Sequence, residues 1–184
     1  MSKKRDDLLE VAERLFYEHG FNGVGLKQIV QEANVATMTL YNHFSSKERL
    51  VEEVLVQRER RYWSYLDKSV KNSEITPFIM AVKGHCDWLE DYSYKGDMFL
   101  RAIEDYSGID EQIENVARGH KHRLLSYLES IAKTAGMKNG HDLAIRYTIL
   151  MEGTTSMTTL IGVEEATSHA LDVAKLFVNE ASTI

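Results

Sequence analysis

The chain has 184 residues, of which 43% are hydrophobic and 27% are charged. These proportions are typical of globular proteins and exclude a disordered or fibrous chain, and the length suffices for one large domain or two smaller ones. Because proline occurs once and the glycines are mostly isolated, the composition favours helices over a strand-rich fold, so we expect an all-α protein.

The net charge of −6 is unevenly distributed along the chain. Residues 1–50 hold seven Lys or Arg and seven Asp or Glu, so the remainder, with 15 basic and 21 acidic residues, carries the whole net charge. The acidic balance therefore does not exclude nucleic-acid binding by the amino-terminal segment, where Lys3, Lys4 and Arg5 offer a basic footprint. A solvated tail is the alternative explanation for these three residues.

The cellular compartment is predicted from cysteine usage and hydropathy. Cys86 is the single cysteine, which excludes an intrachain disulfide and is typical of a reducing compartment. The first residues are charged, and no run approaches the roughly 18 apolar residues of a membrane span. We therefore expect no secretory signal, no membrane segment and a cytoplasmic location.

The first predicted helix runs from about Asp6 to His19. Gly20 is expected to end it, with Phe21 folding back onto its last turn. The apolar residues of this helix recur at helical spacing on one face: Leu8, Leu9, Ala12, Leu15 and Phe16.

Residues 25–44 predict two short helices joined by a tight turn. The first has one apolar face, formed by Leu26, Ile29, Val30 and Ala33. Asn34 follows it, and asparagine tolerates the left-handed backbone conformation that such a turn needs. The buried side of the second helix is expected to carry Ala36, Leu40 and Phe44. This pattern is that of a helix-turn-helix.

The outer face of the second helix suits the major groove of DNA. With about 100° of rotation per residue, Met38 and Asn42 lie opposite the buried side. Asparagine can bond adenine, and methionine can touch the methyl group of thymine. Neighbouring side chains that can bond phosphate oxygens are Thr37, Thr39, Tyr41 and His43. An ordinary helical hairpin with a polar outer face is the alternative that this local pattern leaves open.

A fourth helix is predicted to begin near residue 46 and to continue through Leu66, long enough to connect two domains. Ser45 and Glu48 are spaced as a capping box. Lys47 then lies in the first turn, where a cation opposes the helix dipole, so its presence favours an external anion such as a phosphate. A tolerated surface lysine is the alternative.

This amino-terminal segment resembles that of the TetR family of bacterial transcriptional regulators. The resemblance rests on Leu-Tyr-Asn-His-Phe followed by Ser-Ser-Lys-Glu-Arg-Leu, downstream of Ala-Glu-Arg-Leu-Phe-Tyr-Glu-His-Gly-Phe, and covers about residues 6 to 55. It implies a DNA-binding domain over residues 1–48 and a helical effector-binding and dimerisation domain over residues 49–184. The implied DNA contacts are Thr37, Met38, Thr39, Tyr41, Asn42 and His43 on the recognition helix, Lys27 and Gln28 on the supporting helix, and Lys47.

Three positions depart from the family pattern. Gly25 stands where the family usually has a Thr or Ser cap, Asn34 replaces the usual turn glycine, and Ala36 replaces the usual serine cap. Glycine and asparagine are tolerable substitutes. Alanine cannot cap a helix, so Thr37 is a candidate cap, which would compete with its contact to a base.

The remaining two thirds of the chain predicts five further helices. Thr76 and Pro77 form a cap and first-turn proline, and Gly108, Gly136 and Gly162 follow helix ends. The predicted helices cover about residues 77–92, 98–106, 111–134, 141–161 and 164–181.

The last two predicted helices have apolar faces with small residues, which let helix axes approach closely. They could complete a core within the chain. The resemblance implies instead that they pair with the same helices of a second subunit in a two-fold symmetric homodimer. The candidate interface residues are Leu150, Met157, Ala170, Val173, Ala174 and Phe177.

The middle helices are rich in aromatic residues and methionine, which favours core packing for any single residue. The resemblance implies that this domain encloses a small, largely apolar effector. The candidate lining residues are Phe78, Trp88, Tyr92, Met98, Phe99, Tyr106 and Met151. Nearby acidic residues (Glu90, Asp91, Glu104 and Asp105) could favour a cationic ligand, or could simply be exposed.

Metal and catalytic sites find no support in the sequence. His120 and His122 lie two residues apart and would point to different faces of a helix, and the same objection applies to His85 and Cys86. Phosphate-loop, dinucleotide and nucleophile-elbow motifs are not found, so we expect neither an enzyme nor a cofactor. The leading hypothesis is a dimeric repressor that binds a palindromic DNA operator and is released by an effector. The alternative is a DNA-scaffolded interaction protein regulated by a protein partner.

Overall fold

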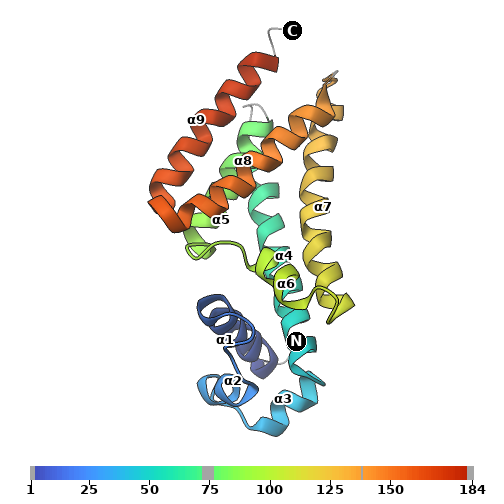
Figure 1. Ribbon diagram of the computed structural model, residues 1–184, viewed down its shortest axis with the longest axis vertical. Coiled ribbons are helices and arrows are strands. Elements are labelled where there is room, and N and C mark those ends of the chain that lie inside the picture. Colours follow the sequence, from blue (N-terminus) through green and yellow to red (C-terminus); the bar gives the residue numbers. More distant parts are fainter. Residues whose placement is uncertain (1–2, 72–76, 138, 182–184) are drawn as a thin grey trace. The chain divides into compact units, whose positions relative to one another are not determined.

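The computed structural model describes residues 3–71, 77–137 and 139–181, which form nine α-helices (Figure 1). The helices are α1 (Lys3–His19), α2 (Leu26–Glu32), α3 (Thr37–His43), α4 (Lys47–Lys71), α5 (Pro77–Tyr92), α6 (Met98–Tyr106), α7 (Glu111–Thr134), α8 (Gly140–Ile161) and α9 (Val163–Ala181). The prediction of an all-α fold is confirmed. The predicted ends of α6 and α7 agree with the structure, whereas the predicted cap residue Thr76 lies outside the described residues.

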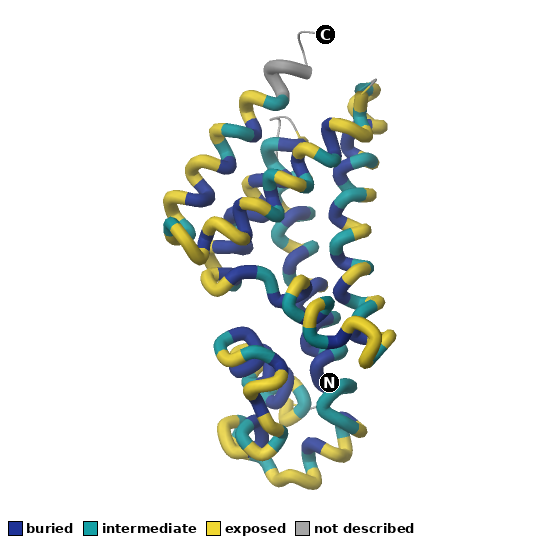
Figure 2. Tube along the Cα trace, in the orientation of Figure 1, coloured by how far each residue is buried: buried dark blue, intermediate teal, exposed yellow. Residues whose placement is uncertain are grey.

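The chain forms two compact units, each with its own hydrophobic core. Unit 1 comprises the residues up to Glu59 together with Met98–His120, and unit 2 comprises Arg60–Asp97 together with the residues from Lys121 onwards. Most helices are buried along one side (Figure 2). By packing, α6 and the first part of α7 therefore belong with the amino-terminal helices. The division into functional domains at residues 48 and 49 stays a prediction.

The core of unit 1 closes around the end of α1. Gly20 has a φ of +77° and its backbone N–H donates to the carbonyl of Phe16 at 2.9 Å, so the chain leaves the helix in the left-handed conformation that glycine favours. The ring of Phe21 then lies 5.5 Å from that of Phe16 and 5.7 Å from that of Tyr106 on α6. The prediction that Phe21 folds back is confirmed.

Buried charges link α1, α4 and α6 within unit 1. Arg58 Nη1 lies 2.9 Å from Glu13 Oε1, and both side chains are buried. The guanidinium carbons of Arg58 and Arg101 lie 4.7 and 5.0 Å from the ring centre of Tyr17. Arg101 also donates to the Tyr17 carbonyl at 2.9 Å, which satisfies a carbonyl in the last turn of α1. These contacts fix α1 to its two neighbours.

In unit 2, helices α5, α8 and α9 pack together. Phe78 stacks on Tyr147 with ring centres 4.6 Å apart, and the Tyr147 hydroxyl donates to the carbonyl of Ala174 at 2.6 Å. Gly84 lets α5 approach α4 closely, since a Cβ atom at this position would lie 2.9 Å from the carbonyl oxygen of Tyr65. An aromatic core and one close helix crossing therefore hold unit 2 together.

Candidate functional site

The turn of the helix-turn-helix is built on Asn34. Among the residues that the structure describes, it is the one non-glycine with a positive φ, of 51°. Its N–H donates to the carbonyl of Gln31 at 3.2 Å, and that of Val35 donates to the carbonyl of Val30 at 3.1 Å. These two bonds form a Schellman motif, in which the residue after the helix cap adopts the left-handed conformation. The predicted role of Asn34 is confirmed.

The recognition helix α3 begins without a side-chain cap. Ala36 occupies the N-cap position with extended backbone dihedrals (φ −72°, ψ 146°), and no side chain bonds the orphan N–H groups there. Thr37 is the first helical residue, so the candidate role of Thr37 as the cap of α3 is excluded. Ala36 is exposed, so its expected place on the buried side is also wrong. Thr37 is thereby left available for contact with DNA.

The outer face of α3 is exposed as the helical projection predicts. Leu40 and Phe44 are buried in the core of unit 1. Met38 is 69% exposed and Tyr41 51% exposed, large fractions for apolar and aromatic side chains, and Asn42 is exposed beside them. The other predicted contacts lie at the edge of this surface: Thr37 is exposed, and Thr39 and His43 are half-buried.

The supporting helix α2 carries two of the predicted DNA contacts, an exposed lysine and a glutamine whose amide is hydrogen-bonded within the helix. Lys27 is exposed, whereas Gln28 is half-buried and donates from Nε2 to Glu32 Oε1 at 3.2 Å. Glu32 also accepts a hydrogen bond from Arg14. The bond from Arg14 and, to a smaller extent, that from Gln28 lower the pKa of Glu32 below its ordinary value of 4.5. The carboxylate thus stays ionised and orients Gln28 along the helix.

Lys47 is the first residue of α4, but the predicted capping box is wrong. The cap is Ser46, whose Oγ accepts from the N–H of Arg49 at 3.3 Å, rather than Ser45 with Glu48. Serine is a favoured N-cap residue at either position, and which one caps depends on where the chain leaves α3. The ammonium of Lys47 lies 6.0 Å from the ring centre of Phe16, so the lysine has a contact within the protein as well as a place beside α3.

A family model described as "Bacterial regulatory proteins, tetR family" matches residues 8–54, which span α1 to the first part of α4. In this amino-terminal segment the chain matches the TetR family. The prediction of a TetR-type amino-terminal segment, made from the sequence motif, is confirmed.

Known regulators resemble the chain over different lengths. The HTH-type transcriptional repressor KstR2 of Mycolicibacterium smegmatis is 39% identical over 54 residues, which is 29% of this chain and 26% of the relative. YvkB of Bacillus subtilis, an uncharacterized HTH-type transcriptional regulator, is 22% identical over 138 residues, which is 73% of this chain and 71% of the relative. The chain thus matches only about a quarter of the length of the first of these relatives.

Solved structures extend the likeness of fold to the whole chain. SCO4454, a TetR-family transcriptional regulator from Streptomyces coelicolor, superposes with a TM-score of 0.89 at 23% identity, covering 97% of this chain and 96% of that one. A TetR transcriptional regulator from Legionella pneumophila superposes with a TM-score of 0.81 at 23% identity, covering 96% and 97%. These comparisons establish a TetR-type fold for α4 to α9.

The residues predicted to line one effector pocket fall into two separate cores of the chain. Met98, Phe99 and Tyr106 belong to the core of unit 1. Four others belong to unit 2: Phe78, Trp88 and Met151 are buried, and Tyr92 is half-buried. The sequence could not distinguish these sets, because α6 follows α5 directly but packs with the amino-terminal helices.

Unit 2 encloses polar groups next to its predicted lining residues. The Nε2 atom of His85 lies 2.9 Å from the carbonyl of Met151 and 3.1 Å from the hydroxyl of Thr155, and Nδ1 lies 3.1 Å from the hydroxyl of Tyr62. A carbonyl only accepts, so Nε2 carries the proton and Nδ1 accepts from Tyr62, whose pKa is raised well above its ordinary value by burial. Tyr62 also meets Trp88 edge-on at 5.8 Å. The sequence does not reveal this network, because its members come from α4, α5 and α8.

An ion triad lies in the same unit. Lys121 pairs with Asp97 and, at 2.6 Å, with Glu152. Burial alone would lower the pKa of Lys121, but attraction to the two carboxylates outweighs it, so the pKa is raised above 10.5. The side chain of Lys121 is 24% exposed, and the triad therefore has contact with solvent.

The residues predicted for the dimer interface differ in exposure. Ala170 and Ala174 are buried within the same chain. Leu150, Val173 and Phe177 are half-buried, and Met157 is 39% exposed. Three further large apolar residues of α8 and α9, which are not among the predicted interface residues, are exposed: Ile149, Leu160 and Leu176, with exposed fractions of 66%, 76% and 59%.

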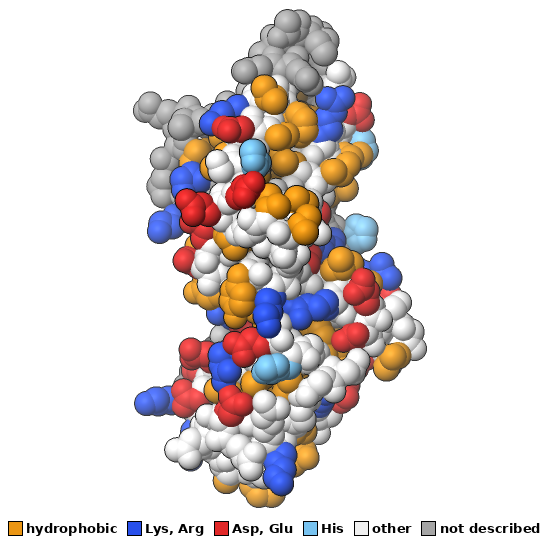
Figure 3. Space-filling view, turned by 60° about the vertical axis from the view of Figure 1, so that its left-hand side comes forward, with side chains coloured by type: hydrophobic (Ala, Val, Ile, Leu, Met, Phe, Trp, Pro, Cys, Tyr) orange, Lys and Arg blue, Asp and Glu red, His pale blue; other side chains and the backbone are white. Residues whose placement is uncertain are grey.

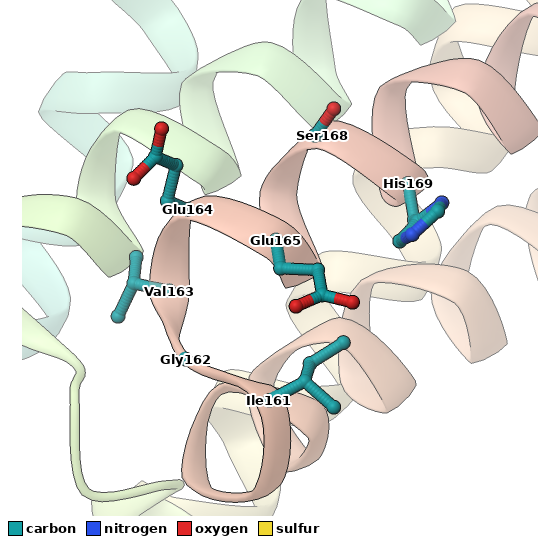
Figure 4. Close-up of a pocket in the computed structure, with 7 residues that line it drawn as sticks. All are labelled: Ile161, Gly162, Val163, Glu164, Glu165, Ser168 and His169. Atoms are coloured by element: carbon teal, nitrogen blue, oxygen red, sulfur yellow. The ribbon is translucent and has the colours of Figure 1, made fainter.

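A surface pocket lies where α8 turns into α9. It is lined by Ile161, Gly162 and the first residues of α9, and the side chains of Ile161, Glu165 and His169 point to the same side of the turn (Figure 4). None of the seven predicted effector contacts lines it. Within the described part of the chain, no group of three or more His, Cys, Asp or Glu side chains is placed to hold a metal ion, and no helix is long and apolar enough to cross a membrane.

Proposed function

We propose that the chain is a homodimeric repressor of the TetR family that binds a palindromic DNA operator through α3 and is released by a small, largely apolar effector. The observation that carries the proposal is the outer face of α3, where Met38, Tyr41 and Asn42 are exposed while Leu40 anchors the helix in the core. A helix held in this way can enter the major groove with its exposed side chains against base edges.

Dimerisation is proposed from the apolar residues that α8 and α9 leave exposed. Four large apolar side chains of these helices remain exposed to solvent: Ile149, Met157 and Leu160 on α8, and Leu176 on α9. Hydrophobic side chains are visible among charged ones on the face that Figure 3 shows. A soluble chain rarely leaves several large apolar side chains exposed on two adjacent helices, so we propose that a second copy covers them by two-fold symmetry.

Effector binding is proposed for the interior of unit 2. Aromatic side chains surround a few polar groups there, namely His85, Thr155 and the hydroxyl of Tyr62. Small-molecule sites commonly combine an apolar lining with a few polar atoms that orient the ligand. An effector would release DNA if it bound more tightly to a dimer whose α3 helices are spaced wrongly for the operator.

The DNA contacts are tested by titrating an operator, and base-substituted versions of it, at several salt concentrations. Asn42→Ala should reduce discrimination against the substituted operators by about 1–3 kcal/mol if the asparagine bonds a base. Tyr41→Phe removes one hydroxyl and should weaken every sequence alike, by about 1 kcal/mol. Lys47→Ala should flatten the dependence of log affinity on log salt by about one unit per contacted phosphate.

If Asn42→Ala weakens every sequence equally and Tyr41→Phe changes base preference, the two roles must be exchanged. A lack of any sequence preference in the wild-type protein would contradict the proposed function itself.

A further inference from the structure

The recognition helix carries no formal charge. Between Thr37 and His43 there is no Lys, Arg, Asp or Glu, and the exposed side chains are a thioether, a phenol, an amide and a hydroxyl. His43 is half-buried, with its ring 6.3 Å from that of Phe44. The chemistry that α3 can offer to base edges is therefore narrow.

Base edges in the major groove differ in what they require. Guanine presents two acceptors and is read best by Arg or Lys, whereas cytosine presents a donor that Asp or Glu accepts. Adenine presents one acceptor and one donor, which match the amide of asparagine, and thymine presents a methyl group that binds apolar side chains. On α3, the amide is that of Asn42 and the most exposed apolar side chain is that of Met38.

Arginines from the rest of the amino-terminal segment are engaged elsewhere. Each of the four up to residue 59 forms an ion pair with a glutamate of unit 1. The pairs are Arg5 with Glu53, Arg14 with Glu32, Arg49 with Glu52, and Arg58 with Glu13. A bidentate contact from one of them to guanine would require breaking its pair. The segment thus holds its guanidinium groups in structural contacts and presents neutral side chains at its reading surface.

From these observations we infer that α3 reads A·T base pairs, with Asn42 on an adenine and Met38 on the methyl group of a thymine. The inference rests on the proposed function, since it names the bases that this DNA-binding surface selects. Met38 and Asn42 are four residues apart on one face, which corresponds to about 6 Å along the helix axis. Base pairs rise by about 3.4 Å, so the two side chains contact bases within about two steps of each other. Lys27 and Lys47 serve as phosphate contacts at the border.

Selection from a random duplex library with the full chain tests this inference. The expected result is an enriched half-site with adjacent or nearly adjacent A·T pairs at its centre. Failure to enrich any sequence would overturn the proposed function. An enriched half-site whose helix-contacted centre is G·C would overturn the inference alone and leave the proposed function intact.

Single-atom changes in the selected operator then assign the contacts. Replacing one thymine by uracil removes only the methyl group and should weaken wild-type binding about threefold to fivefold at the contacted position. The same replacement should have no effect on Met38→Ala, but should keep its effect on Tyr41→Phe, the control variant. Replacing the contacted adenine by 7-deazaadenine removes its acceptor and should weaken binding about fivefold or more, with no further loss in Asn42→Ala. Equal sensitivity in the variants and the wild type would overturn the assignment.

Discussion

The buried ion pair between Glu13 and Arg58 provides a sharp test of how unit 1 is held together. The side chains are 8% and 3% exposed, their nearest atoms lie 2.9 Å apart, and the guanidinium also lies over the ring of Tyr17. The variant Glu13→Gln keeps the size of the side chain and one hydrogen-bond acceptor but removes the negative charge. It therefore removes the negative charge that lies 2.9 Å from the buried Arg58 cation.

The expected loss follows from this geometry. Breaking a buried pair by removing one partner costs about 3–5 kcal/mol, and we expect about 3 kcal/mol here because the glutamine oxygen still accepts one hydrogen bond. For a chain of this length, that free energy of unfolding corresponds to a fall in Tm of about 6–12 °C. The double variant Glu13→Gln/Arg58→Met should be more stable than Glu13→Gln alone, since it also removes the buried cation that has lost the Glu13 carboxylate.

The measurement is unfolding by heat and by urea, which does not screen charge, at one fixed protein concentration. The matched control is Asp87→Asn, which removes a carboxylate from the exposed pair that Lys83 forms with it at 2.7 Å in α5. Exposed pairs four residues apart contribute about 0.3–0.5 kcal/mol, so the control should lower Tm by only about 1–2 °C. The reasoning is refuted if Glu13→Gln lowers Tm no more than Asp87→Asn.

Further predictions concern the dimer, packing, capping and pH dependence. Leu160→Glu should yield monomers in sedimentation velocity. The control is Ile109→Glu in unit 1, which should leave the dimer intact although Ile109 is of similar size and is 77% exposed, against 76% for Leu160. A dimer in both variants would place the interface elsewhere. Gly84→Ala should lower the free energy of unfolding by about 1–3 kcal/mol in urea titrations, because the new methyl group would clash with the backbone of α4. A variant more stable than the wild type would show that α4 and α5 can move apart without a loss of free energy. Ala36→Ser should raise stability by about 0.5–2 kcal/mol by supplying the missing cap of α3, and an unchanged Tm would mean that another group already satisfies those N–H donors. Hydrogen bonds, first from Arg118 and then from the Gly108 N–H, lower the pKa of Glu114 below 4.5. The stabilising effect of the Glu114 carboxylate is therefore present above pH 4.5 and is lost as the pH falls through the lowered pKa. The difference in Tm between the wild type and Glu114→Gln should shrink from about pH 6 to about pH 3, and a constant difference would contradict the ionic origin of the effect.

The sequence by itself determined the helices and the helix-turn-helix, because the signals involved are local. A positive φ at Asn34 or Gly20 is a property of one residue and its immediate neighbours. The apolar spacing that buries Leu40 and exposes Met38 follows from the period of a single helix, and the structure agrees with both assignments. The choice of Ser46 over Ser45 as the cap marks the limit of this reasoning, since two adjacent residues of the same type differ only in backbone path.

Only the tertiary structure decided which helices share a core. The composition of α6 does not distinguish burial in unit 1 from a place among the aromatic residues of α5, because a helix stripe specifies that it needs an apolar partner and not which one. The same holds for α9, where Ala170 and Ala174 suit either an interface between subunits or a core within the chain, and pack in the core.

Pairs far apart in sequence were also beyond prediction from the sequence. Glu13 and Arg58 are separated by 45 positions, and Tyr62, His85 and Thr155 come from three different helices. Nothing in the local pattern of any of these residues names its partner, because each contact exists only after the helices have packed. The periodicity of each helix therefore determined which of its faces is buried, and the packing of the nine described helices determined which residues contact that face.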